Sequence, residues 1–145
     1  MEPKQAILIQ QPWVQMIFHP DPEKRKTWEI RSFDTCKRGL FAIAVVGAKR
    51  LAGQVELVKT IQVAERKEHG GFGPVGMDEE NYLMEQRKWK KAGFNYAPYP
   101  DVLKKKDKLF AWEFANAQEY DPPKKWRHKS GAVVFANIND EKKDY

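Results

Sequence analysis

Short apolar runs, separated by charged stretches, set the pattern of this chain. Residues 6–9 and 41–46 are continuous apolar runs of strand length, and the second is predicted to be a central strand buried on both faces. Residues 27–33 and 53–61 mix apolar with polar positions at a period near two, which also predicts strands. Residues 109–114 and 132–138 bring the expected number of strands to five or six.

Two segments carry the features of helices. Pro12 suits the first position of a helix, and apolar residues follow Trp13 at the i+3 and i+4 positions of one helical face. Residues 78–91 place acidic side chains first and basic side chains last, which matches the helix dipole. Residues 69–76 and 116–128 are predicted to be loops. The glycine pattern inside the first loop lacks the preceding buried strand that a dinucleotide-binding motif needs.

These elements predict one α+β domain, a small mixed β-barrel of about five or six strands with two or three flanking helices. The 145 residues are enough for a single core, expected over 6–138, followed by a charged tail at 139–145. No run approaches the roughly 18–20 apolar residues of a membrane helix, so no membrane association is expected.

Charge and cysteine content narrow the expected function. The net charge is +6 and the pI is about 9.3, which favours a polyanionic partner, although a basic surface can also serve solubility alone. Cys36 is the single cysteine, so no disulfide can form within the chain, which fits an intracellular protein of the cytoplasm or nucleus. The three histidines are far apart, and neither a metal site nor a cofactor is predicted.

The stretch KRKTWEIRSF, residues 24–33, is the first candidate for a binding site. On a strand, Glu29 and Arg31 share one face, while Trp28 and Ile30 share the other. Glu29 and Arg31 can therefore pair. They could form a surface ion pair of little energetic value, or a partly buried pair that presents polar groups to a ligand.

A second candidate is the basic stretch KKWRHK at residues 124–129. Cations hold phosphates, and an exposed aromatic ring can stack on an unpaired base. Lys124, Lys125, Arg127 and Lys129 would follow the phosphates, and Trp126 would stack on a base. The alternative is a solvated loop with Trp126 in the core.

Several motifs, taken in order, resemble the ASCH domain (activating signal cointegrator homology) of the PUA-like superfamily. They are Gln11-Pro12-Trp13, then Lys26-x-x-Glu29-x-Arg31-Ser32, then Arg38-Gly39 before an apolar strand. Residues 51–58 and 110–135 are similar to later segments of that family, so the resemblance covers about residues 6–138. It implies a PUA-like barrel with a cleft near the Pro-Trp helix and the Lys-Glu-Arg strand, and RNA or another nucleic acid as the ligand.

The resemblance also implies roles for individual residues. Lys26 and Arg31, with Ser32 beside them, would contact phosphates or base acceptors, and Arg38 would contact the nucleic-acid backbone. Glu29 would accept a hydrogen bond from a base or hold Arg31 in place. Trp13 would line the pocket, or belong to the core.

Two other functions stay open at this point. Some relatives resemble amidohydrolases that act on N4-acetylcytidine, so the domain could be a hydrolase of such a modified nucleoside or of RNA. Lys26 and Glu29 would then be catalytic, although Glu29 stands where those relatives carry a threonine. The domain could also bind a protein partner within an RNA-processing or transcription assembly. A nucleic-acid-binding monomer without enzymatic activity is the favoured expectation.

Overall fold

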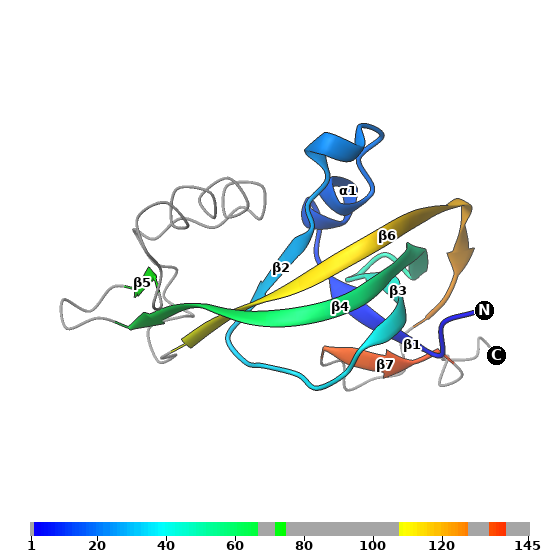
Figure 1. Ribbon diagram of the computed structural model, residues 1–145. Coiled ribbons are helices and arrows are strands. Elements are labelled where there is room, and N and C mark those ends of the chain that lie inside the picture. The colour runs from blue at the N-terminus through cyan, green and yellow to red at the C-terminus, as the bar shows by residue number, and fades with distance from the viewer. Residues whose placement is uncertain (1, 67–71, 75–107, 128–133, 139–145) are drawn as a thin grey trace.

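The computed structural model describes residues 2–66, 72–74, 108–127 and 134–138, and these form one open mixed β-sheet (Figure 1). The strand order is β2-β6-β4-β3-β1-β7, and β5 pairs with β4 beside this path. Strands β1 and β3 run parallel, and the other pairs are antiparallel. The strands are β1 (Gln5–Ile9), β2 (Trp28–Arg31), β3 (Gly39–Val45), β4 (Arg50–Arg66), β5 (Phe72–Pro74), β6 (Lys108–Lys125) and β7 (Phe135–Asn137).

The predicted α+β barrel with two or three flanking helices is wrong. The end strands β2 and β7 are not paired with each other in the described part of the chain, so the sheet is open. Helical structure among these residues is limited to α1 (Trp13–Ile17) and the 3-10 helix η1 (Pro22–Lys24). The helix predicted over 78–91 lies outside the described residues. No helix in the described part is long and apolar enough to cross a membrane.

Strands β4 and β6, of 17 and 18 residues, are the longest strands of the sheet and cross the middle of the view in Figure 1. Their pairing shifts register at four places, each of which adds bend or twist. Asn116 takes a φ of 53° beside one shift, a conformation that asparagine tolerates better than most residues. At Gly53 a Cβ atom would lie 2.4 Å from the carbonyl oxygen of Gln118, so glycine permits the close approach of β6.

The loop predicted over 116–128 is also wrong, because β6 continues through Pro122 and Pro123 to Lys125. Proline lacks an N–H donor and is tolerated where one edge of a strand has no partner. At this end β6 pairs with β4, whereas its pairing with β2 covers residues 110–113. The prolines therefore interrupt no central ladder.

The two sheet faces around β1 and β3 carry side chains of different size. One face holds Ile7, Ile9, Ile43 and Val45 within the main core cluster. The other face carries alanines at 6, 42 and 44, and Trp126 packs there. The expectation that residues 41–46 form a strand buried on both faces is confirmed for residues 41–45.

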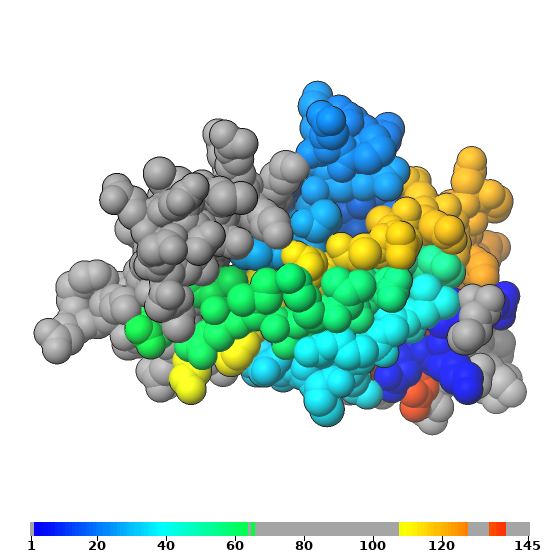
Figure 2. All heavy atoms as spheres, in the orientation of Figure 1, coloured from blue at the N-terminus to red at the C-terminus, as the bar shows by residue number. Residues whose placement is uncertain are grey.

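Before β2, the chain rises above the sheet through α1 and η1, the blue region that stands over the yellow band of β6 in Figure 2. The connection from His19 to Arg25 is held by its own side chains. Asp21 Oδ1 accepts a hydrogen bond from the Glu23 N–H at 3.0 Å, and Arg25 Nε donates to the His19 carbonyl at 2.7 Å. This connection delivers Lys26 to the start of β2.

Candidate functional site

Alternate side chains of strand β2 lie on opposite faces of the sheet. Glu29 lies opposite Trp112 of β6, on the face that carries the main core. Trp28 lies opposite Glu113 on the other face, and its indole Nε1 donates to Glu113 Oε1 at 3.1 Å. The prediction that Glu29 and Arg31 share a face and pair is therefore confirmed, and that face is turned toward the interior.

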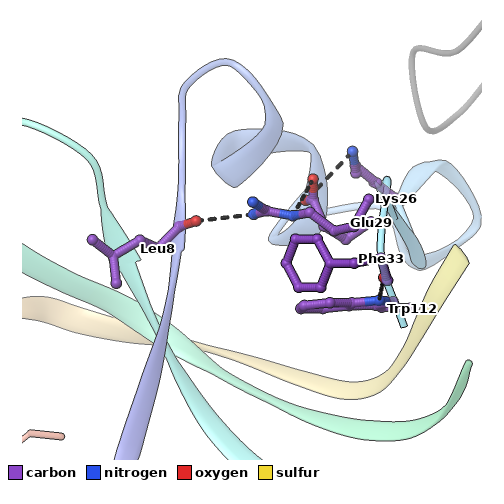
Figure 3. A network of polar contacts seen from close by, with 6 residues as sticks. Leu8, Lys26, Glu29, Phe33 and Trp112 are labelled. Carbon is purple, nitrogen blue, oxygen red and sulfur yellow. Dashed lines mark hydrogen bonds and ion pairs between the residues drawn. The ribbon is translucent and has the colours of Figure 1, made fainter. Parts of the chain in front are cut away.

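Lys26, Glu29 and Arg31 form what we name the Lys–Glu–Arg cluster (Figure 3). Lys26 Nζ lies 3.6 Å from Glu29 Oε2, and Arg31 Nε lies 3.7 Å from Glu29 Oε1. The side chains of Lys26, Glu29 and Arg31 are 2%, 9% and 22% exposed. The cluster is thus a buried group of charges, and the surface ion-pair alternative does not apply.

The cluster leaves two buried polar atoms unsatisfied. Among the described residues, Glu29 Oε2 and Arg31 Nε have no hydrogen-bond partner, since both ion-pair distances exceed hydrogen-bond length. Buried polar atoms without partners are rare, because each one costs about 1–3 kcal/mol. An acceptor and a donor held side by side without partners are therefore suited to a ligand that supplies the complementary groups.

Arg31 also links two strands that are not neighbours in the sheet. Its Nη2 donates to the Leu8 carbonyl oxygen of β1 at 3.0 Å (Figure 3). In the strand order, β6, β4 and β3 lie between β2 and β1. The sheet must therefore curl so that its β2 end approaches β1, and the guanidinium spans the remaining gap.

Lys26 is positioned by helix α1. Its backbone N–H donates to the Met16 carbonyl at 2.9 Å, and its Nζ lies 4.6 Å from the centre of the Trp13 ring, within the range of a cation–π contact. Burial lowers the pKa of Lys26 from its ordinary value, while the attraction of Glu29 opposes this shift. The Pro-Trp motif and the Lys-Glu-Arg motif, more than ten residues apart in sequence, thus meet at one place.

Aromatic rings support the cluster from below. Phe33 packs edge-on against Trp112 with ring centres 5.4 Å apart, and Trp112 Nε1 donates to the Phe33 carbonyl at 3.2 Å. The Arg31 guanidinium lies 5.7 Å from the centre of the Trp112 ring. Trp112 is fully buried, whereas Phe33 is 41% exposed, so the Phe33 ring is the one that can receive another flat ring.

Neither Phe33 nor Trp112 was predicted from the sequence to be a site residue. The available signal was the apolar Phe33 at the end of a charged stretch and Trp112 within an almost wholly apolar strand. Neither signal separates a site residue from an ordinary core residue. Trp112 lies opposite Glu29 through the pairing of β2 with β6, and Phe33 contacts Trp112 from the residues after β2.

Arg38 lies on the same face of the sheet as Glu29, but its hydrogen bonds hold the loop after β2. Its Nη1 donates to the Thr35 carbonyl at 2.8 Å and its Nη2 to Thr60 Oγ1 at 3.1 Å. A hydrogen bond from Thr60 in turn lowers the pKa of Asp34. Thr60 of β4 lies opposite Trp112 of β6, which in turn lies opposite Glu29 of β2. Thr60 is therefore two strand spacings, or roughly 10 Å, from Glu29. Arg38 fixes the loop after β2 and is exposed, so it remains a candidate contact at the edge of the site.

Lys37 is a cation that the sequence analysis did not select. Its Nζ donates to Gln5 Oε1 at 3.1 Å and lies 5.2 Å from the centre of the Phe135 ring. The Phe135 ring stacks on Trp112, with ring centres 5.4 Å apart and an interplanar angle of 9°. Lys37 and Arg31 are therefore two cations set against one stacked aromatic pair.

The second basic stretch does not join the cluster. Lys124 and Lys125 lie at the far end of β6, where Lys124 Nζ is 3.9 Å from Glu2 Oε1 and 4.6 Å from the centre of the Tyr120 ring. Trp126 is 4% exposed and its Nε1 donates to the Ile138 carbonyl at 2.9 Å, so its ring cannot stack on a base. Arg127 is half-buried, and Lys129 lies outside the described residues. Ser32 is half-buried directly after Arg31.

A separate pocket of about 350 Å³ lies between α1 and the ends of β4 and β6. Its floor includes Phe18, and its polar lining comes from Gln11, Gln15, Arg50 and Glu119, all of which are exposed. The Lys–Glu–Arg cluster is a stronger candidate, because its polar groups are buried and incompletely paired.

Within the described ranges, no three histidine, cysteine, aspartate or glutamate side chains are grouped as metal ligands would be. No protein-family model matches the chain, and comparison with curated proteins finds no match. The functional conclusion therefore depends on the site itself.

Proposed function

We propose that this protein binds a nucleic acid, with RNA as the favoured ligand, by holding one nucleotide at the Lys–Glu–Arg cluster. The observation that carries the proposal is the buried carboxylate of Glu29, with one oxygen lacking a hydrogen-bond partner, set between the charged groups of Lys26 and Arg31. A nucleobase offers N–H donors and carbonyl acceptors on one edge, which are the groups that this arrangement lacks.

The surroundings of the cluster fit a flat, negatively charged ligand. The exposed ring of Phe33 offers a surface on which a base can stack, a contact worth about 1–3 kcal/mol per base. The charges of Lys26 and Arg31 outnumber the single carboxylate of Glu29, so the site keeps a positive excess that attracts phosphate. Arg38 lies close enough along the same face to contact a neighbouring phosphate.

The resemblance to ASCH domains supports the same proposal. Its two most informative motifs, Pro12-Trp13 and Lys26-x-x-Glu29-x-Arg31, contact each other here through Trp13 and Lys26. The remote lysines 124 and 125 are not needed for this mode of binding. We assign them to general electrostatic attraction rather than to recognition.

The test is the affinity of short single-stranded RNA, measured by fluorescence anisotropy at two salt concentrations. We expect salt-sensitive binding that weakens roughly ten- to hundredfold in Phe33→Ala, because a base stack is lost. The control is Lys124→Ala/Lys125→Ala, which should reduce affinity slightly and alter mainly the salt dependence. Equal affinity in wild type and Phe33→Ala, with a large loss in the lysine control, would contradict the proposal.

A second candidate function rests on Lys26 alone. Because burial lowers the pKa of Lys26, a larger fraction of its amine is neutral near physiological pH than for an exposed lysine. Lys26 could then accept a proton from a water molecule that attacks the acetyl carbonyl of N4-acetylcytidine, giving acetate and cytidine. Turnover that disappears in Lys26→Met would favour this candidate, and absence of turnover in wild type would remove it.

A further inference from the structure

We infer that the base held at the Lys–Glu–Arg cluster is of the uracil type, with a ring N–H between two carbonyl groups. This inference rests on the proposed function and specifies its ligand. Its basis is the order of the three charged groups, which is donor, acceptor, donor. Glu29 lies between Lys26 and Arg31, with one carboxylate oxygen nearest to each cation.

The middle position selects for a ring N–H. Ionised Glu29 can only accept hydrogen bonds, and its Oε2 has no partner among the described residues. Uracil and thymine present an N3–H there. Cytosine N3 and adenine N1 are acceptors and would place a lone pair against the carboxylate, leaving both groups buried and unpaired.

The outer positions select for carbonyl oxygens on both sides. Protonated Lys26 and Arg31 can only donate, and Arg31 Nε is the second buried atom without a partner. Uracil carries O4 and O2 on either side of N3–H, so every group in the row is matched. Guanine has a ring N–H and one carbonyl, but its exocyclic amine would face a cation. The expected order of preference is therefore uracil first, guanine second, and cytosine and adenine last.

Contacts around the cluster hold its two cations in place, and they do not distinguish one base from another. Arg31 Nη2 already donates to Leu8, which orients the guanidinium so that Nε faces Glu29. The cation–π contact of Lys26 with Trp13 and the hydrogen bond of its N–H to Met16 anchor the other side of the row. The Phe33 ring can stack on any base, so it contributes affinity without discrimination.

The test compares wild-type binding of five-residue single-stranded RNAs that contain only uridine, cytidine or adenosine, at one salt concentration. We expect the uridine oligomer to bind roughly tenfold or more tightly than the other two, the discrimination typical of a matched base edge. An oligomer of 3-methyluridine, which lacks the N3–H, should lose this advantage. Because these four ligands are tested on the unaltered protein, the result does not depend on the folding of a variant.

The matched variant is Glu29→Gln, whose amide can both accept and donate. It should bind the uridine and cytidine oligomers with similar affinity, while Lys124→Ala keeps the wild-type preference. Equal wild-type affinity for all oligomers, or unchanged affinity for 3-methyluridine, would overturn the uracil assignment and leave the proposed nucleic-acid binding intact. If none of the oligomers binds, both proposals fail.

Discussion

Two stretches of this chain have similar residue types but differ in which of those residues are buried. Residues 24–33 and 124–129 both interleave lysine and arginine with tryptophan. In the first, the charges of Lys26 and Glu29 are buried and the phenylalanine at its end is exposed. In the second, Lys124 and Lys125 are exposed and Trp126 is buried. The same residue types therefore build the proposed recognition site in one place and an ordinary surface over a core tryptophan in the other.

The difference comes from what each stretch meets in the sheet. Glu29 faces the core side opposite Trp112, and its charge is balanced by a cation on either side. Trp126 meets a face lined by small residues such as Ala42 and Ala44, where a large ring fills the available space. A charged and aromatic stretch cannot be interpreted alone, because its partners decide which side chains are buried.

The sharpest test of this contrast removes one carboxylate from each region. Glu29→Ala should lower the free energy of unfolding by about 3–5 kcal/mol, because it leaves the buried Lys26 and the half-buried Arg31 without their counter-ion. Glu2→Ala, which removes the exposed partner of Lys124, should change it by less than about 0.5 kcal/mol. Urea denaturation of both variants measures the difference, and similar values would show that the cluster is not a buried charge network.

Among the aromatic residues, Trp126 should contribute mainly to stability and Phe33 mainly to RNA binding. Trp126→Ala should cost about 3–5 kcal/mol of stability, because it empties a buried position. Phe33→Ala should cost about 0.5–1.5 kcal/mol, the value of a ring pair such as Phe33 with Trp112. Thermal denaturation combined with RNA binding separates the two effects. A stable Trp126→Ala protein that loses RNA binding would contradict the assignment.

The pH dependence of stability should distinguish Lys26 from the exposed lysines. The pKa of Lys26 is lowered by burial from 10.5, which is also its value in the unfolded chain. Between the folded value and 10.5 the unfolded chain binds more protons, so the Lys26 contribution makes the free energy of unfolding rise with pH in that window.

Side-chain NMR titration of Lys26 checks the shift directly. Glu29→Gln should lower its pKa further, because the attraction of the carboxylate is lost. The Lys26→Met protein should lack the rise in stability that this group contributes. A pKa of Lys26 at or above 10.5 would mean that the attraction of Glu29 outweighs the effect of burial, contrary to this prediction.

The smallest effect is expected at the second basic stretch. Replacing Lys124 and Lys125 by alanine should leave stability nearly unchanged, because both side chains lie in solvent. If the two lysines contact phosphate at all, the slope of log affinity against log salt should decrease by at most about 1.4, or roughly 0.7 for each contact to a single strand. A larger decrease, with loss of most of the affinity, would move the binding site to this end of β6.

The strands that could be predicted are those with continuous apolar runs, such as 6–9, 41–46 and 109–114. The full length of β4 and β6 could not be predicted. Register shifts break the alternation of apolar and polar residues, and Pro122 is typical of a loop. In the site, the period of two placed Glu29 and Arg31 on one face. The burial of the Lys–Glu–Arg cluster depends on Leu8, Trp13 and Trp112, which long-range contacts bring together and no local pattern specifies.

The indole N–H signals of the tryptophans provide the most direct test of the central claim, that the ligand binds at the Lys–Glu–Arg cluster. We would record ¹H–¹⁵N spectra during titration with a short single-stranded uridine-rich RNA, with assignments from single tryptophan-to-phenylalanine variants. Binding at the cluster should shift the signals of Trp13 and Trp112 in a saturable way and leave that of Trp126 in place. A shift of Trp126 with Trp13 and Trp112 unmoved would contradict it.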